Sequence, residues 1–171
     1  MVSRKGQAIR FSEKDVRAMG RDASGVQGMR LRGDDEVISV AIAADDADLL
    51  VVTENGYGKR TRVADYPRKG RGGMGVKTVQ LTEARGYLVG ARVVRDGYQV
   101  MMISTGGTMI RMSVDDIRRM GRSTQGVIVM RLREGELVSS LAPVVESGDD
   151  ESLDAVADDL PDAPAEPSGA V

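Results

Sequence analysis

Gly56-Tyr-Gly-Lys-Arg-Thr-Arg-Val-Ala-Asp65 is a stretch whose pattern occurs three times in the chain. The first copy, Gly6–Asp15, lies 50 residues earlier, and the third, Gly107–Asp116, lies 51 residues later. In every copy an arginine stands four positions after the glycine, and an aspartate stands nine positions after it. These residues are Arg10, Arg60 and Arg111, and Asp15, Asp65 and Asp116. A pattern that recurs at this spacing indicates a repeat architecture.

The similarity between the three copies continues downstream in the same order. A Gly-Arg pair comes first, then a Gly-Val pair, and then an apolar segment that ends in leucine. The Gly-Arg pairs are Gly20-Arg21, Gly70-Arg71 and Gly121-Arg122; the Gly-Val pairs are Gly25-Val26, Gly75-Val76 and Gly126-Val127; the leucines are Leu31, Leu81 and Leu132. We expect the recurring glycines to lie in turns with positive φ or where two backbones approach closely.

Short apolar runs rich in β-branched residues and bounded by glycine or aspartate indicate β-strands. They lie at 37–42, 49–53, 76–81, 87–94, 99–104, 127–132 and 137–144. Helical character is confined to 13–19 and 114–120, where we expect a turn of helix or a loop. Repeats of about 50 residues with about four strands each are typical of propeller blades. The sequence therefore predicts an all-β fold with three blade-like repeats, at about 1–47, 48–97 and 98–145.

The charges of the chain are divided between a basic body and an acidic tail. Residues 1–145 hold all 24 basic residues and 17 acidic ones, a net charge of +7, whereas residues 146–171 hold nine acidic residues and no basic one. A basic body makes an anionic partner such as nucleic acid plausible, although it is also compatible with a solvated surface. The tail has little to bury and is expected to be disordered, either as a solubilising end or as an electrostatic rival of DNA for the body.

The composition removes several classes of chemistry. The chain contains no cysteine and no histidine, which excludes thiolate and imidazole metal ligands, disulfides and histidine-based acid-base catalysis. Acidic pairs such as Asp45-Asp46 are expected to be solvated turns, so no metal site is predicted. The sequence shows neither a membrane span nor a secretion signal, and a cytoplasmic protein is expected.

The best candidates for contact with nucleic acid are the arginines of the Gly-Arg pairs, Arg21, Arg71 and Arg122, because exposed basic turns can lie against a phosphate backbone. The strand arginines Arg10, Arg60 and Arg111 are expected to form a stripe along one rim, unless each pairs with the recurring aspartate of its own unit. The glycine-rich stretches 56–60 and 68–75 lack the pattern of a nucleotide-binding loop, and their basic residues Lys59, Arg68 and Lys69 complete the predicted binding set.

Longer stretches resemble a known family. Thr53-Glu-Asn-Gly-Tyr-Gly-Lys-Arg-Thr61 followed by Asp65-Tyr-Pro67, and Val16-Arg-Ala-Met-Gly-Arg21 followed by Gly25-Val-Gln-Gly28, resemble late blades of the C-terminal domain of bacterial DNA gyrase A subunits. Gly121–Val127 resembles the final blade of that domain, which an acidic tail also follows. The resemblance covers about residues 3–145. It implies a β-pinwheel, a propeller-like ring of about six blades whose basic outer edge bends double-stranded DNA around itself.

The resemblance also implies a function within a larger enzyme. Sequence-tolerant wrapping of DNA supports ATP-dependent negative supercoiling by the type IIA topoisomerase formed with the gyrase A cleavage domain and the gyrase B subunit. The chain itself is expected to catalyse nothing and to carry no cofactor, since ATP and magnesium belong to the rest of that enzyme. Three units instead of about six suggest a piece of a longer protein.

Some features depart from the family pattern, and two other interpretations stay open. The basic glycine box that marks the first blade of the family is missing, and residues 69–75 are only a degenerate relative of it. One alternative is the C-terminal domain of a topoisomerase IV A-type subunit, although the regular offsets of 50 and 51 residues favour gyrase. The other is a protein-binding β-propeller, which the lack of tryptophan and the aromatic content of 3% argue against.

Overall fold

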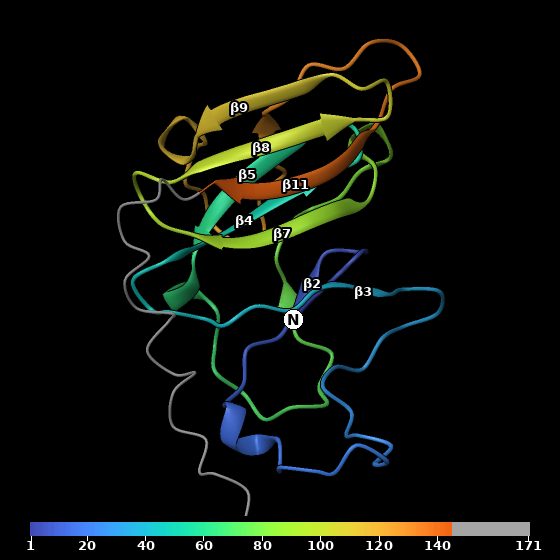
Figure 1. Cartoon of the computed structure of the whole chain (residues 1–171), viewed down its shortest axis with the longest axis vertical. Coiled ribbons are helices and arrows are strands. Elements are labelled where there is room, and N and C mark those ends of the chain that lie inside the picture. The colour runs from blue at the N-terminus through green and yellow to red at the C-terminus, as the bar shows by residue number, and fades with distance from the viewer. Residues whose placement is uncertain (145–171) are drawn as a thin grey trace, which may run out of the picture.

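The computed structural model describes residues 1–144 and contains three antiparallel sheets. The sheets follow one another along the long axis of the molecule, from the first repeat in blue at one end to the third repeat in yellow and orange at the other (Figure 1). No α-helix occurs among the described residues, and the only helical segments there are short 3₁₀ turns. The predicted all-β fold is therefore confirmed, while the predicted disordered tail lies outside the described residues.

Across each sheet, from one edge to the other, the strands lie in an order that differs from their order along the chain. The first sheet contains β3 (Val37–Ser39), β1 (Val2–Ser3), β2 (Gln7–Ala8) and β6 (Val76–Lys77). The second contains β7 (Leu88–Val94), β4 (Asp48–Thr53), β5 (Tyr57–Arg62) and β10 (Val127–Ile128). The third contains β11 (Val138–Val144), β8 (Gln99–Ser104) and β9 (Met109–Ser113). The 3₁₀ turns are η1 (Glu13–Asp15), η2 (Val63–Asp65), η3 (Glu83–Arg85) and η4 (Val114–Asp116).

Neighbouring repeats exchange strands. The first sheet takes its end strand β6 from the second repeat, where Val76 pairs with Ala8 of β2. The second sheet takes its end strand β10 from the third repeat, where Val127 pairs with Gly58 of β5. The polypeptide therefore passes twice from one sheet to the previous one, through residues 67–75 and 118–126, which we call the first and second crossing segments.

The Gly-Val pairs make this exchange possible because they stand where the crossing strand meets its partner. Gly75 has a φ of 76°, and a Cβ atom there would lie 2.3 Å from the carbonyl oxygen of Ala8. Gly126 has a φ of 80°, and a Cβ atom there would lie 2.9 Å from the carbonyl oxygen of Gly58. Only glycine tolerates both the left-handed backbone and the close approach, as predicted.

The glycines of the Gly-Arg pairs differ from this prediction. Gly20, Gly70 and Gly121 have no positive φ, and a Cβ atom at each would meet nothing within 4 Å. The expectation of a positive φ or a close approach is therefore wrong for these three positions, which lie in open turns.

The buried apolar residues form two clusters, one on each side of β4. Leu49 and Val51 of this strand belong to the cluster between the first and second sheets. Leu50 and Val52, which point to the opposite face, belong to the cluster between the second and third sheets. Because its residues belong to both clusters, β4 is the strand that joins all three repeats. Each fully buried side chain of this size stabilises the fold by about 1.5–3 kcal/mol.

Several predicted strands are shorter than expected. β6 and β10 have two residues each, because Thr78 and Val129 already leave the ladder and bond to the turns at Gly6 and Gly56. Within residues 1–144 the segment that ends at Leu31 forms no strand, since its counterparts pair with the sheet of the preceding repeat, and the first repeat has no such sheet there. β3 ends at Ser39 because β1 offers only two partners, and Ile42 is 91% exposed. The predicted turns at 13–19 and 114–120 are confirmed as η1 and η4.

Candidate nucleic-acid interface

The crossing segments carry basic side chains along one edge of the stacked sheets. Each segment leads into the end strand of a sheet, β6 or β10, on the side away from β3, β7 and β11, which contact one another in sequence. Arg68, Lys69 and Arg71 of the first segment and Arg118 of the second are exposed, and Arg122 is half-buried. Both crossing segments thus present cations on this outer edge, and Arg71 and Arg122 do so at equivalent places, 51 residues apart.

The first crossing segment is tied to the first repeat partly by Arg71 itself. The amide of Lys69 donates to the carbonyl of Arg10 at 2.9 Å. The guanidinium of Arg71 donates through Nε to the carbonyl oxygen of Asp15 at 2.8 Å and through Nη1 to that of Gln27 at 3.1 Å. Arg71 is exposed, yet part of its donor capacity holds the segment in place.

The second crossing segment is tied to β5 by backbone and side-chain bonds. The amide of Met120 donates to the carbonyl of Arg60 at 2.8 Å, and the hydroxyl of Thr61 donates to the carbonyl of Met120 at 2.9 Å. The ammonium of Lys59 donates to the carbonyl oxygens of Gly121 and Arg122, both at 2.6 Å, and to the hydroxyl of Thr124 at 3.1 Å. The segment is therefore fixed from Arg118 to Thr124.

Lys59 is fully buried, in contrast to the exposed binding residue that the sequence predicts. Burial and the nearby charge of Arg122 lower the pKa of Lys59 to about 8. Because its ammonium faces the inside of the second crossing segment, Lys59 supports the outer edge without forming part of its surface.

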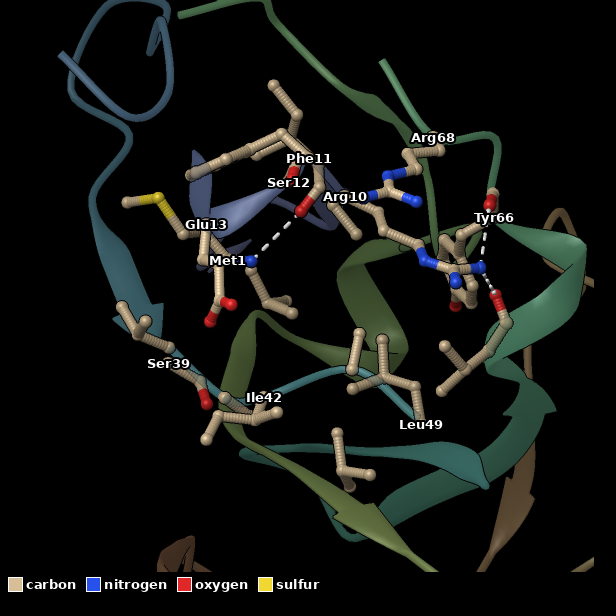
Figure 2. Close-up of a pocket in the computed structure, with 18 of the residues that line it drawn as sticks. Met1, Arg10, Phe11, Ser12, Glu13, Ser39, Ile42, Leu49, Tyr66 and Arg68 are labelled. Carbon is tan, nitrogen blue, oxygen red and sulfur yellow. Dashed lines mark hydrogen bonds between the residues drawn. The ribbon is translucent and has the colours of Figure 1, made fainter. Parts of the chain in front are cut away.

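The strand arginine of the first repeat, Arg10, faces the second repeat. Its guanidinium pairs with Asp45. It also donates to the carbonyl oxygens of Val63 at 3.1 Å and Tyr66 at 3.5 Å, the bonds drawn as dashed lines from Arg10 in Figure 2. The side chain of Arg10 is only 18% exposed. This arginine therefore joins the first sheet to the turn η2 of the second repeat.

The strand arginine of the second repeat, Arg60, is buried more deeply. Its side chain is 10% exposed, forms ion pairs with Asp48, Asp96 and Asp115, and donates through Nε to the carbonyl of Ile117 at 2.8 Å. Arg119 shares this cluster by donating to Asp48 at 2.9 Å. The hydrogen bond from Arg60 is the main reason why the pKa of Asp96 lies below its ordinary value.

These contacts correct one alternative from the sequence. Arg10 and Arg60 do pair with aspartates, but their partners are not Asp15 and Asp65, the recurring aspartates of their own units. Those aspartates lie in the 3₁₀ turns η1 and η2.

Arg111 is exposed on β9, where its Nε donates to the side chain of Gln99. Arg21 is exposed in the irregular segment that follows η1.

Two basic residues of the second crossing segment, Arg118 and Arg119, are not in the DNA-binding set predicted from the sequence. They stand immediately before the third Gly-Arg pair, and the run from Arg118 to Arg122 contains three arginines in five residues. This local charge density was the signal that could have identified them. Arg118 is exposed. The guanidinium of Arg119, in contrast, donates hydrogen bonds to the carboxylates of Asp48 and Asp96.

An apolar cavity of about 390 Å³ lies between the first and second sheets (Figure 2). Its wall includes Ile9, Phe11, Leu49 and Val93, and Arg68 stands at its rim.

Residues 1–144 contain no group of three or more side chains that could hold a metal ion. The same residues include no helix with the length and apolar character that a membrane crossing requires.

Three blade sheets that exchange strands define a domain of the β-pinwheel class, and this domain carries cations along its outer edge. A sequence profile described as "DNA gyrase C-terminal domain, beta-propeller" matches residues 1–44, 47–95 and 98–144. The chain belongs to this family of DNA gyrase A C-terminal domains. The resemblance inferred from the sequence is thereby confirmed.

Curated relatives with similar sequences are DNA gyrase A subunits. The chain is 47% identical to that of Klebsiella oxytoca over 156 residues, which cover 91% of the chain and 18% of the relative. It is 46% identical to that of Mycobacterium tuberculosis strain H37Rv over 158 residues, which cover 91% of the chain and 19% of the relative. The chain thus spans less than a fifth of the length of these relatives.

Solved structures with a similar fold include C-terminal domains of a DNA gyrase A subunit and of a topoisomerase IV. A DNA gyrase A C-terminal domain matches with a TM-score of 0.79 and 28% identity over 84% of this chain and 49% of that one. A topoisomerase IV C-terminal domain matches with a TM-score of 0.78 and 27% identity over 84% of this chain and 45% of that one. Because the curated relatives are gyrase A subunits, the topoisomerase IV interpretation is not favoured.

Proposed function

We propose that this chain binds and wraps double-stranded DNA along the outer edge formed by its crossing segments, without strong sequence preference. The observation that supports this function best is the presence of exposed basic residues in both crossing segments, at Arg68, Lys69 and Arg71 in the first and at Arg118 in the second. Such residues contact phosphates, which occur in every DNA sequence. Sheets that pack face to face lie about 10 Å apart, so the cations recur at short intervals along the path of a bound duplex.

The interface is smaller than the set that the sequence predicts. Arg10 and Arg60 hold neighbouring repeats together, and Lys59 lies inside, so we assign these three residues structural roles. Arg21, Arg68, Lys69, Arg71, Arg111 and Arg122 remain as proposed DNA contacts, and Arg118 joins them. The contact surface consists of the crossing segments, the irregular segment that carries Arg21 and the edge strand β9 that carries Arg111, with the other strands behind them as a rigid support.

The larger context of this function is a gyrase holoenzyme. The chain would work beside a gyrase A cleavage domain and a gyrase B subunit in the cytoplasm, where wrapping biases the handedness of the DNA crossing before ATP-driven strand passage. The chain would supply binding and bending but no catalytic group and no cofactor. ATP and magnesium would act in the other parts of that enzyme.

A titration of linear duplexes of unrelated sequence into the chain at several salt concentrations tests the proposed function. Binding through phosphates predicts similar affinities for all duplexes and a linear fall of log K with log salt, with a slope of about 0.9 for every neutralised phosphate. A change in the linking number of nicked circular DNA, after closure by a ligase in the presence of the chain, would show wrapping. Absence of binding at low salt would contradict the proposal.

A further inference from the structure

The burial of Lys59 is unusual because its three acceptors are all uncharged. The ammonium donates to two carbonyl oxygens and one hydroxyl, and no carboxylate pairs with it among residues 1–144. A buried cation without a counter-ion costs free energy, even where hydrogen bonds satisfy it. An apolar side chain would fill the same space at a lower cost in free energy. Packing alone therefore does not explain why a lysine is buried here.

A comparison of the two crossing segments provides that reason. In the first repeat the residue equivalent to Lys59 is Ile9, which cannot donate from its side chain. There the guanidinium of Arg71 holds its own segment by donating to two backbone carbonyls. In the second repeat Lys59 bonds the carbonyl of Arg122 from inside. The guanidinium of Arg122, the equivalent of Arg71, has no hydrogen-bond or ion-pair partner in the part of the chain that the structure describes.

The same arrangement places the charges of Arg122 and of the buried Lys59 close enough together that Arg122 adds to the effect of burial in lowering the pKa of Lys59. Each raises the local potential that an anion meets, and an anion that binds to Arg122 also relieves the repulsion between the two cations. The guanidinium of Arg71 spends two of its donors on backbone carbonyls, whereas that of Arg122 keeps its donors available for phosphate. Both effects favour Arg122 over Arg71 as a phosphate contact.

We propose that Lys59 is a positioning residue, which holds the turn from Gly121 to Thr124 from inside so that the guanidinium of Arg122 is directed to a DNA phosphate. This inference rests on the proposed function. It assigns the two Gly-Arg arginines different roles, with Arg71 as a tie between repeats that contacts DNA weakly and Arg122 as the main contact.

A double-mutant cycle tests the proposal with Lys59→Met, Arg122→Gln and the double variant, with affinity for a linear duplex measured at several salt concentrations. In the wild-type background, Arg122→Gln is expected to weaken binding several-fold at low salt and to make the salt slope shallower by about 0.9. In the Lys59→Met background the same substitution is expected to change neither quantity, because the turn no longer directs Arg122. Equal effects in both backgrounds would mean that Lys59 only stabilises the fold, and would overturn the proposal.

Two controls make the outcome specific. Lys5→Gln removes one positive charge from an exposed turn where Lys5 pairs with Asp34, and should reproduce neither the affinity loss nor the coupling to Arg122. If it reproduces both, charge alone explains the result and the proposal fails. Thr124→Val removes one acceptor of Lys59 with little change in volume, and it replaces Lys59→Met in the cycle if that variant unfolds. A wild-type chain that does not bind DNA would instead contradict the proposed function.

Discussion

The Nη1 atom of Arg60 lies 3.3 Å from Oδ2 of Asp48, and the two side chains are 10% and 4% exposed. Asp48 stands at the start of the central strand β4, and Arg60 also reaches the carbonyl of Ile117 in the third repeat. An ion pair withdrawn from water in this way stabilises the native state only while both partners are present. Through its contacts with Ile117 and Asp115, Arg60 links the second and third repeats at a point where the sequence suggests a DNA contact.

Arg60→Met is expected to lower the free energy of unfolding by about 3 kcal/mol, because it leaves Asp48 buried with only Arg119 as a partner. Arg111→Met, the equivalent change at an exposed position, is expected to cost less than about 1 kcal/mol. Urea denaturation of both variants measures the difference. A similar small loss for both would show that the buried position of Arg60 contributes no special stability.

Gly75→Ala is expected to destabilise the chain by about 2 kcal/mol or more, since the new methyl group meets the carbonyl of Ala8 and the backbone is left-handed. Gly70→Ala, five residues earlier in the same crossing segment, adds a methyl group in open space and is expected to change stability by less than about 0.5 kcal/mol. Thermal unfolding of the two variants compares them directly. Equal midpoints would contradict the role assigned to the Gly-Val pair.

Removal of the exposed charges at Arg68, Lys69 and Arg118 is expected to weaken DNA binding without a loss of stability. If all three side chains touch phosphates, the salt slope of binding becomes shallower by about 2 to 3. A control that removes two positive charges elsewhere is Lys5→Gln combined with Arg95→Gln, at turns between strands where the two residues pair with Asp34 and Asp46. A slope that stays at the wild-type value would remove the crossing segments from the binding surface.

The stability of the native state is expected to rise with pH between about 8 and 9.5. Lys59 has a pKa of about 8 in the native state and an ordinary value of 10.5 in the unfolded chain. Over this window the unfolded chain binds more protons than the native state, so the free energy of unfolding increases with pH. Burial raises the pKa of Tyr66, whose ionisation in the unfolded chain opposes the trend only near pH 10.

The measurement for this pH dependence is urea denaturation at pH 7.5, 8.5 and 9.5 for the wild type and Lys59→Met. The variant lacks the titrating group, so the difference in stability between the two proteins should shift in favour of the wild type as the pH rises. A constant difference across the three pH values would show that Lys59 does not titrate in this range.

Deletion of residues 146–171 is expected to tighten DNA binding several-fold at low salt. This segment lies outside the described residues and carries nine acidic and no basic residues, whereas residues 1–145 carry a net charge of +7. A tethered polyanion competes at an effective concentration in the millimolar range, and salt screens the competition over a Debye length of about 8 Å at 0.15 M. A tail that only keeps the protein soluble predicts the same affinity with and without it at every salt concentration.

The sequence predicts the repeats, the blade-like fold and the special role of the Gly-Val glycines, because these depend on local patterns that recur. The sequence does not predict which residues surround the individual basic side chains. Lys59 lies in a glycine-rich basic stretch that suggests an exposed loop, but its burial depends on Gly121 and Arg122, more than 60 residues away. The partners of Arg10 are likewise remote, since the carbonyl of Val63 is 53 residues away. A pattern within one repeat cannot contain contacts that the exchange of strands creates between repeats.

The exchange of strands also sets an order of events during protein synthesis. The first sheet is incomplete until Val76 and Lys77 have left the ribosome, although its other three strands end at Ser39. The second sheet likewise waits for Val127 and Ile128. The first and second repeats therefore each keep an unpaired strand edge until most of the next repeat has been translated.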